Sequence, residues 1–288
     1  MKIISDLIDI LHLDQINSHT FSGVSATVGS PNVFGGQVLA QALNAAYRTI
    51  HNNRNLHSMH AYFLEPGNLE LPIVYHVEVI RDGGSFSTRR VTAKQETKTI
   101  FILSASFHKE EKGYDHQIEF KKDIPQPEKL MSWEDILQQM GDFLPKSIKY
   151  FFEIERPIDF KPVQINNPLE RQDLEPNLEV WFKFKGDIPE LTRDLKYQLL
   201  TYVSDYNILT ATLHPHASVA NYSNTQMASL DHSMWYFRDF DLNDWMLFSI
   251  ESPNANNARG FAKGNIFTRD GRLVASVAQE GLMRPKES

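Results

Sequence analysis

The 288-residue chain contains no cysteine. It therefore has no disulfide, no thiolate nucleophile and no cysteine-ligated zinc site. No apolar run approaches the ~18 residues needed to cross a bilayer, so no membrane span is expected. Residues 1–13 are rich in isoleucine and leucine but carry Asp6 and Asp9, and their apolar positions recur at helical spacing. This pattern predicts an amphipathic helix rather than a signal peptide, and we expect a cytoplasmic protein.

Several catalytic signatures are also missing. The chain has no GxSxG, no P-loop, no HExxH and no GxGxxG. The nearest approach, GGSFS at residues 83–87, predicts a hairpin turn. The net charge of −7 argues against a nucleic-acid-binding protein, which needs a basic face. The eleven histidines are scattered, so we expect neither a metal nor a cofactor.

An unusual string occurs twice, as HSMHAYF at residues 57–63 and DHSMWYF at residues 231–237. In each half, a segment with helical periodicity precedes the string and segments with strand alternation follow it. This order predicts two copies of one α+β unit, in which the repeated string forms equivalent strands. The first half comprises a helix at 34–50 and strands at 57–63, 73–80, 86–95 and 99–107. The second comprises a helix at 197–213 and strands at 180–186, 231–237, 245–252, 258–268 and 272–281.

A polar segment with prolines lies between the two copies. We therefore predict an N-terminal unit at residues 1–112, a linker at 113–130 and a C-terminal unit at 131–288. Since unpaired sheet edges invite pairing with another chain, we also expect a homodimer or homotetramer.

The two halves differ in their polar residues. In the last strand of each half, Phe107 aligns with Gln279, and an amide on a core-facing strand must find hydrogen-bonding partners. In the helices, Gln37 aligns with Asp205. The polar residues of the second half also have ordinary explanations when each is taken alone. Asp205 could lie on the solvated stripe of its helix, and Ser229 could be an ordinary strand hydroxyl. Asp231 and His232 could be a turn acid and a structural histidine.

The motifs together resemble those of the acyl-CoA thioesterase II family over nearly the whole chain. The resemblance implies a double hotdog fold, in which two tandem units each have a long central helix wrapped by an antiparallel sheet. It is carried by VFGGQVLAQAL, LHSMHAYFLEPG, IRDGGSFSTRR, YVSDYNIL, ASLDHSMWYFR and NARGFAKGNIFTRDGRLVASVAQEGLMR.

The same resemblance implies the activity and the site. Family members hydrolyse fatty acyl-CoA to free acid and CoA, with a water held by Asp, Thr or Ser, and Gln. By position these are Asp205, Ser229 and Gln279 in the second half, and the first half carries a degenerate site. Asp205 would activate the water as a general base, while Ser229 and Gln279 would hold it.

Further substrate-binding residues are expected around these three. The backbone N–H groups of Gly35 and Gly36, at the start of a helix, could stabilise the oxyanion. His57 and His60 could line the pocket or be structural. Positive side chains on nearby strands could bind the CoA phosphates or lie on a solvated face: Arg89, Arg90, Arg259 and Lys263.

Two other functions fit the same fold. A hotdog enoyl-CoA hydratase would need a histidine five residues after Asp205, where this chain has Thr210. A non-catalytic acyl-CoA-binding module would gain nothing from Gln279 on a core face. Hydrolysis is therefore the preferred prediction.

Overall fold

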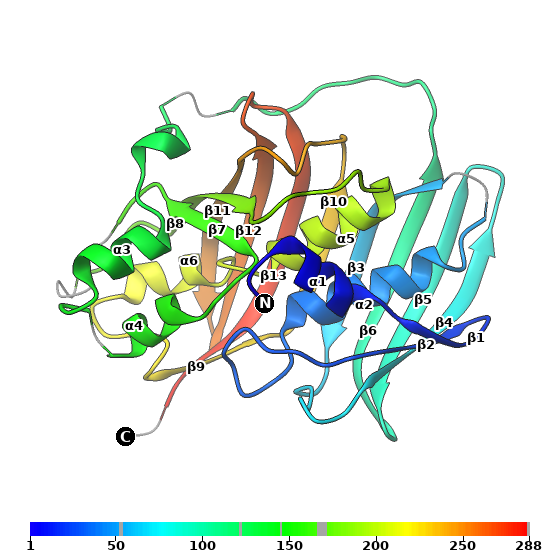
Figure 1. The fold of residues 1–288 in the computed structure, drawn as a ribbon, viewed down its shortest axis with the longest axis horizontal. Coiled ribbons are helices and arrows are strands. Elements are labelled where there is room, and N and C mark those ends of the chain that lie inside the picture. The colour runs from blue at the N-terminus through cyan, green and yellow to red at the C-terminus, as the bar shows by residue number, and fades with distance from the viewer. Residues whose placement is uncertain (52–53, 121–122, 145, 166–171, 287–288) are drawn as a thin grey trace.

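The structure, a computed structural model, describes residues 1–51, 54–120, 123–144, 146–165 and 172–286. Its strands form one antiparallel sheet in the order β1-β2-β4-β5-β6-β3-β10-β13-β12-β11-β8-β7, with β9 paired to β13 (Figure 1). The strands are β1 (Asp14–Asn17), β2 (Thr20–Gly23), β3 (Arg54–Phe63), β4 (Ile73–Asp82), β5 (Phe86–Gln95), β6 (Lys98–Lys109), β7 (Ile158–Pro162), β8 (Asn177–Phe184), β9 (Thr225–Ser229), β10 (Asp231–Tyr236), β11 (Met246–Asn256), β12 (Arg259–Thr268) and β13 (Leu273–Pro285).

The repeated string forms the junction between the halves. Strand β3 pairs with β10 in antiparallel register, so that Met59 lies opposite Met234 and His60 opposite Ser233. On either side of this pair the order repeats: β6, β5 and β4 follow β3, and β13, β12 and β11 follow β10. The two copies of the string are therefore equivalent strands, and they pair with each other.

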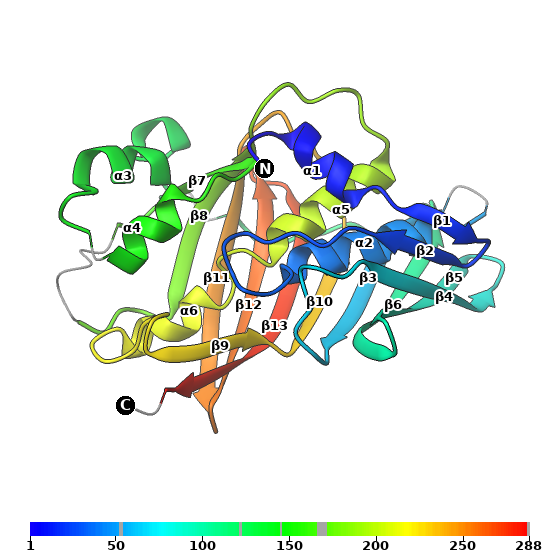
Figure 2. The same ribbon diagram turned by 60° about the horizontal axis from the view of Figure 1, so that its bottom comes forward.

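The helices cover one face of this sheet (Figure 2). Helix α2 contacts β4, β5 and β6, whereas α6 contacts β8, β11 and β12, and α5 lies beside α2. The helices are α1 (Ile4–Leu11), α2 (Gly35–Tyr47), α3 (Trp133–Met140), α4 (Lys146–Glu153), α5 (Arg193–Ser204) and α6 (Thr210–Leu213), with short 3₁₀ turns η1 (Pro127–Lys129) and η2 (His214–His216).

The single helix predicted at 197–213 is wrong, because the chain breaks it into α5 and α6. Asp205 is the C-cap of α5, and Asn207 adopts a left-handed conformation with φ of 64°. A left-handed residue ends helical hydrogen bonding, and asparagine tolerates it better than most side chains. The central helix of the second unit is therefore α5, which at 12 residues is nearly as long as the 13-residue α2, and the short α6 follows it.

The segment between the halves is held against the second half. Strand β6 ends at Lys109 and η1 begins at Pro127. In between, the ring of Phe120 packs on Phe267, and the Trp181 indole N–H donates to the Pro125 carbonyl at 2.9 Å. One sheet runs through both halves, so the strand pairing does not mark a boundary between two units. The linker at 113–130 therefore stays a prediction.

Helices α2 and α5 pack unusually closely. Ala40, Ala42, Ala45 and Ala46 of α2 are fully buried. At the start of α2, a Cβ on Gly36 would overlap the backbone carbonyl oxygen of Tyr202 in α5. The closeness of the two helices therefore requires glycine at this position.

We expect Gly36→Ala to lower the free energy of unfolding by about 1–3 kcal/mol, because the helices must move apart. Urea unfolding followed by circular dichroism measures this. The matched control is Gly84→Ala, since a Cβ at Gly84 would meet no atom within 4 Å. Equal stability of both variants would contradict the close packing.

Candidate active site

Asp205, Ser229 and Gln279 lie together beneath the helices. The side-chain amide of Gln279 donates to Asp205 Oδ1 at 3.2 Å and to Ser229 Oγ at 2.8 Å. Ser229 Oγ lies 3.5 Å from the same carboxylate oxygen, at the limit of a hydrogen bond. The three side chains come from a helix end and two different strands, and they form one closed cluster of an acid, a hydroxyl and an amide.

Local structure explains how each residue reaches the cluster. Asp205 follows the last residue of α5, where the chain leaves the helix. Gln279 is buried on the helix-facing side of β13, between the inward positions of Val277 and Gly281. Ser229 ends β9 and pairs with Gly281. The Phe107 position of β6 is apolar and buried, so the first half does not carry the corresponding amide.

The start of α2 faces the same carboxylate from the other half of the chain. The Gly36 backbone N–H donates to Asp205. A Cβ on Gly35 would lie 2.7 Å from Asp205 Oδ2, so glycine leaves the room that the carboxylate occupies. The first N–H groups of a helix have no acceptor within the helix, and they favour a negative charge at this position.

Burial dominates the charge state of Asp205. Protein surrounds the carboxyl group and removes most of its hydration, which raises its pKa from 3.8 to about 7. The hydrogen bonds from Gln279, Gly36 and Ser229 act in the opposite direction but are weaker. The residue keeps partial access to solvent. A carboxylate with this pKa is a stronger base than an ordinary aspartate and is still largely ionised above pH ~7.

A histidine that the sequence reading treated as structural touches the cluster. His232 is fully buried on β10, and its Nδ1 contacts Gln279 Oε1. On the other side of the ring, Nε2 lies 3.0 Å from Ser204 Oγ. The alternation of DHSMWY places His232 on the same face as the buried Met234, which is the signal that could have revealed it.

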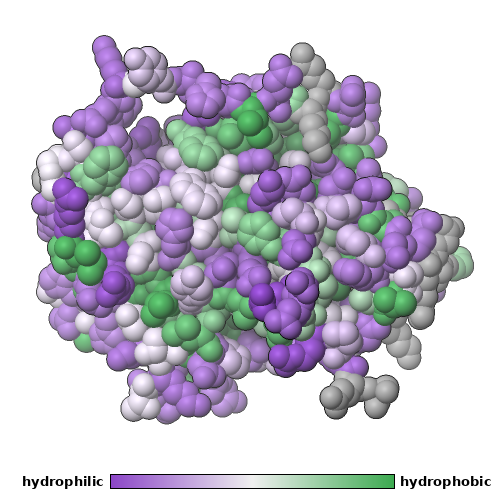
Figure 3. Space-filling model, turned by 180° about the vertical axis from the view of Figure 1, so that it is seen from behind, coloured by the Kyte–Doolittle hydropathy of each residue, from purple (hydrophilic) through white to green (hydrophobic). Residues whose placement is uncertain are grey.

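Four predicted substrate-binding residues lie elsewhere, on the sheet face opposite the helices: His57, His60, Arg90 and Arg259. Figure 3 shows that face of the molecule. His60 bonds Ser233 Oγ at 3.1 Å, and Ser233 alternates with the inward His232. His57 bonds Ser106 at 2.8 Å. Ser106 lies between the inward-facing Ala105 and Phe107 and therefore points outward. The cluster of Asp205, Ser229 and Gln279 does not include them, and their role in binding stays a prediction.

Two of the three arginines also lie on this outer face, and the third points inward. Arg259 pairs with Glu280 at 2.9 Å, and Glu280 points away from the face that carries Gln279. Arg90 lies 4.0 Å from Glu78 on an exposed part of β5. Arg89 points inward and is buried, where it donates to Thr49 and pairs with Asp82. Its bonds hold the loop after α2.

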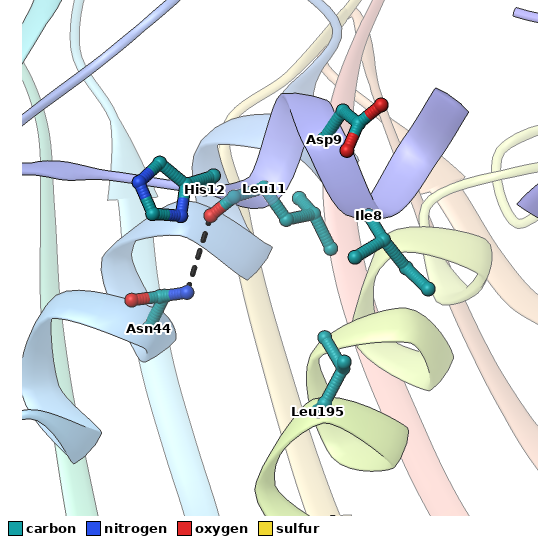
Figure 4. Close-up of a pocket in the computed structure, with 6 residues that line it drawn as sticks. All are labelled: Ile8, Asp9, Leu11, His12, Asn44 and Leu195. Atoms are coloured by element: carbon teal, nitrogen blue, oxygen red, sulfur yellow. Dashed lines mark hydrogen bonds between the residues drawn. The ribbon is translucent and has the colours of Figure 1, made fainter. Parts of the chain in front are cut away.

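A cavity of about 380 Å³ opens between α1, α2 and α5 (Figure 4). Its walls include Ile8, Asn44 and Leu195, and Asn44 donates to the Leu11 carbonyl at 3.1 Å. Asn44 lies eight residues beyond Gly36, or about 12 Å along the helix. The cavity is therefore separate from the cluster at Asp205. Within the described ranges, no group of three or more His, Asp or Glu side chains is placed to hold a metal ion.

Comparison with known proteins identifies the class. A protein-family model described as the acyl-CoA thioesterase N-terminal domain matches residues 24–108. A second family model, described as acyl-CoA thioesterase, matches residues 147–282. An acyl-CoA thioesterase II from Mycobacterium marinum has the same fold, with a TM-score of 0.78, 32% identity and 98% of each chain covered. The duplicated sheet and its helices are thus those of the double hotdog thioesterases.

Two curated relatives match along almost the whole chain. Acyl-CoA thioesterase 2 of Haemophilus influenzae is 42% identical over 287 residues, which cover 99% of each chain. Acyl-coenzyme A thioesterase 8 of Mus musculus is 37% identical, over 96% of this chain and 88% of the mouse protein. The chain belongs to the acyl-CoA thioesterase family.

These findings confirm the predicted fold, family and enzyme class, a thioester hydrolase. They do not test which residues are catalytic. They also favour hydrolysis over the hydratase and binding-module alternatives. Thr210, where a hydratase would need histidine, bonds the Tyr222 hydroxyl at 2.8 Å.

The raised pKa of Asp205 predicts a pH-dependent stability. Between the unfolded pKa of 3.8 and the folded pKa of about 7, the folded protein binds a proton that the unfolded chain does not. The group therefore stabilises the fold at low pH, and this contribution is lost as pH rises through about 7.

Urea unfolding of the parent and Asp205→Asn at pH ~5 and pH ~8 measures this effect. We expect the free energy of unfolding of the parent, relative to the variant, to fall by up to about 3 kcal/mol over this interval. A constant difference would show that Asp205 titrates normally.

Proposed function

We propose that the chain hydrolyses fatty acyl-CoA thioesters through a water activated by Asp205 and held by Ser229 and Gln279. The observation that carries the proposal is the convergence of the Ser229 and Gln279 side chains on one carboxylate oxygen of Asp205. The hydroxyl and the amide can each bond a water beside the carboxylate. The raised pKa of Asp205 supports its assignment as the base.

The reaction then needs no covalent enzyme intermediate. Asp205 accepts a proton as the water oxygen attacks the thioester carbonyl carbon. The carbon–sulfur bond breaks, and the CoA sulfur leaves with a proton, which gives free acid and CoA. A positioned base contributes roughly 10²–10⁴-fold in rate.

The oxyanion formed during attack needs a hydrogen-bond donor. The Gly36 N–H is already bonded to Asp205. The Gly35 N–H has no acceptor among the described residues. Of the two glycines, we therefore assign the oxyanion contact to Gly35, at the positive end of α2.

We expect Asp205→Asn to lower kcat at least a hundredfold, because the amide keeps the shape and removes the base. Release of CoA thiol from a long-chain acyl-CoA, followed with a thiol reagent, measures turnover. The control is Asp187→Asn, an exposed aspartate outside the site. Full turnover by folded Asp205→Asn would overturn the assignment.

Ser229→Ala and Gln279→Ala should each lower kcat by less, since each removes one contact to the water. Gln37, which the sequence aligned with Asp205, serves the fold instead: its amide group bonds the Ala26 N–H at 2.9 Å and the Val24 carbonyl at 2.6 Å. A Gln37→Ala variant should therefore have a lower free energy of unfolding, and its kcat should change little.

We also propose a homo-oligomer, a dimer or a tetramer, in the cytoplasm. The outer sheet face shows hydrophobic side chains among hydrophilic ones (Figure 3). By strand alternation, the exposed Tyr62 and Phe86 lie on this face. No helix within the described ranges is long and apolar enough to cross a membrane.

Light scattering at micromolar concentration tests the assembly. We expect a mass of two or four times the 33.1 kDa of one chain. A mass near 33.1 kDa throughout a dilution series would refute the proposed oligomer and leave the catalytic proposal untouched.

A further inference from the structure

A chain of hydrogen-bonding groups leads from the body of α5 to the catalytic cluster. The Ser204 hydroxyl donates to the Thr201 carbonyl at 2.7 Å, and its Oγ lies 3.0 Å from His232 Nε2. The opposite ring nitrogen, Nδ1, contacts Gln279 Oε1. Gln279 then donates to Asp205 and Ser229. Ser204, His232 and Gln279 are all buried, so water cannot replace these contacts.

The donors and acceptors in this chain depend on one another. An ionised Asp205 can only accept, so Gln279 must present its NH₂ group to it. Gln279 Oε1 then faces His232 and needs a donor, which places a proton on Nδ1. A neutral imidazole carries one proton, so Nε2 must accept. The donor within reach is the Ser204 hydroxyl, once it turns from the Thr201 carbonyl to Nε2.

The opposite arrangement conflicts with the base. As long as Ser204 donates to the Thr201 carbonyl, a neutral His232 would carry its proton on Nε2. Nδ1 would then accept from the Gln279 NH₂ group, and the amide oxygen would face the Asp205 carboxylate about where the nitrogen now lies, at 3.2 Å. Two acceptors at this distance repel, so that pattern suits only a protonated Asp205.

Burial keeps His232 neutral. The loss of hydration lowers its pKa from 6.5 to about 4, with an opposing contribution from the Gln279 bond. A cationic imidazole could donate on both sides and would not need Ser204. The fully buried ring therefore carries a single proton at neutral pH, and its position is decided by its two neighbours.

We propose that His232 is a positioning residue for hydrolysis: its Nδ1–H holds the Gln279 amide in the orientation that serves the ionised Asp205, while the Ser204 hydroxyl turns from the Thr201 carbonyl to Nε2. His232 acts through Gln279 and does not touch the substrate. This inference rests on the proposed function of Asp205, Ser229 and Gln279.

The first test measures kcat and KM for His232→Leu, with His214→Leu as the matched control. His214 is a partly buried histidine of the same half whose Nδ1 bonds the Asn177 carbonyl at 2.8 Å. We expect His232→Leu to lower kcat roughly 10- to 100-fold, with KM changed less than about threefold. The control should keep kcat within about twofold. An unchanged kcat in folded His232→Leu would overturn the proposal.

A double-mutant cycle separates positioning from a general structural role. In a Gln279→Ala background the amide is gone, so adding His232→Leu should change kcat less than about threefold. A full additional loss in that background would show that His232 acts independently of Gln279, and the proposal would fail.

Conservative variants provide the same test if His232→Leu does not fold. The side-chain nitrogen of asparagine can occupy the place of Nδ1, whereas that of glutamine reaches the place of Nε2. We expect His232→Asn to exceed His232→Gln in kcat by about fivefold or more. Equal or reversed rates would count against the bond from Nδ1.

The tautomer can be observed without any activity measurement. In protein labelled with ¹⁵N-histidine, the ring signals of His232, assigned by their loss in His232→Asn, report which nitrogen carries the proton. We expect Nδ1–H at pH ~8, where Asp205 is ionised. A proton on Nε2 alone would overturn the inference even in an active enzyme, while Nδ1–H in an inactive protein would place the failure in the proposed function.

Discussion

The pairing of β3 with β10 is the interaction on which the rest of the structure depends. It joins the two copies of the hotdog unit into one sheet through the repeated string. It also sets the helices of the two halves against each other, so that Gly36 of the first half donates to Asp205 of the second. The candidate site is therefore complete only in the duplicated chain, although all three proposed catalytic side chains come from the second half.

Burial of the Asp205 carboxylate costs free energy, and packing elsewhere in the fold offsets this cost. Removing an aspartate from water disfavours its charged form, and the pKa of about 7 at Asp205 reflects that cost. Three donors compensate only partly. Burial raises the proton affinity of Asp205 and so makes it a stronger base. The same burial destabilises the folded state at high pH, where the group is ionised.

The two faces of the sheet have separate roles. The inner face carries Gln279 and His232, and Gln279 meets Asp205 at the end of helix α5. The outer face carries His57, His60, Arg90 and Arg259, which are bonded to neighbours on that face. Since successive residues of a strand point to opposite faces, Arg89 and Arg90 differ completely in environment although they are adjacent in sequence.

Much of the fold was predictable from local patterns. Strand alternation and the repeated string determined the duplicated α+β plan, and the resemblance of motifs determined the family and Asp205, Ser229 and Gln279 as candidates. These patterns involve residues that are close together in the chain, so they can be recognised from the sequence alone. Only the tertiary structure decided that Asn207 breaks the predicted helix, that Gly36 reaches Asp205, and that His232 contacts Gln279. The last two depend on groups distant in the chain meeting where water is excluded, and burial and hydrogen-bond partners exist only once the two halves have packed.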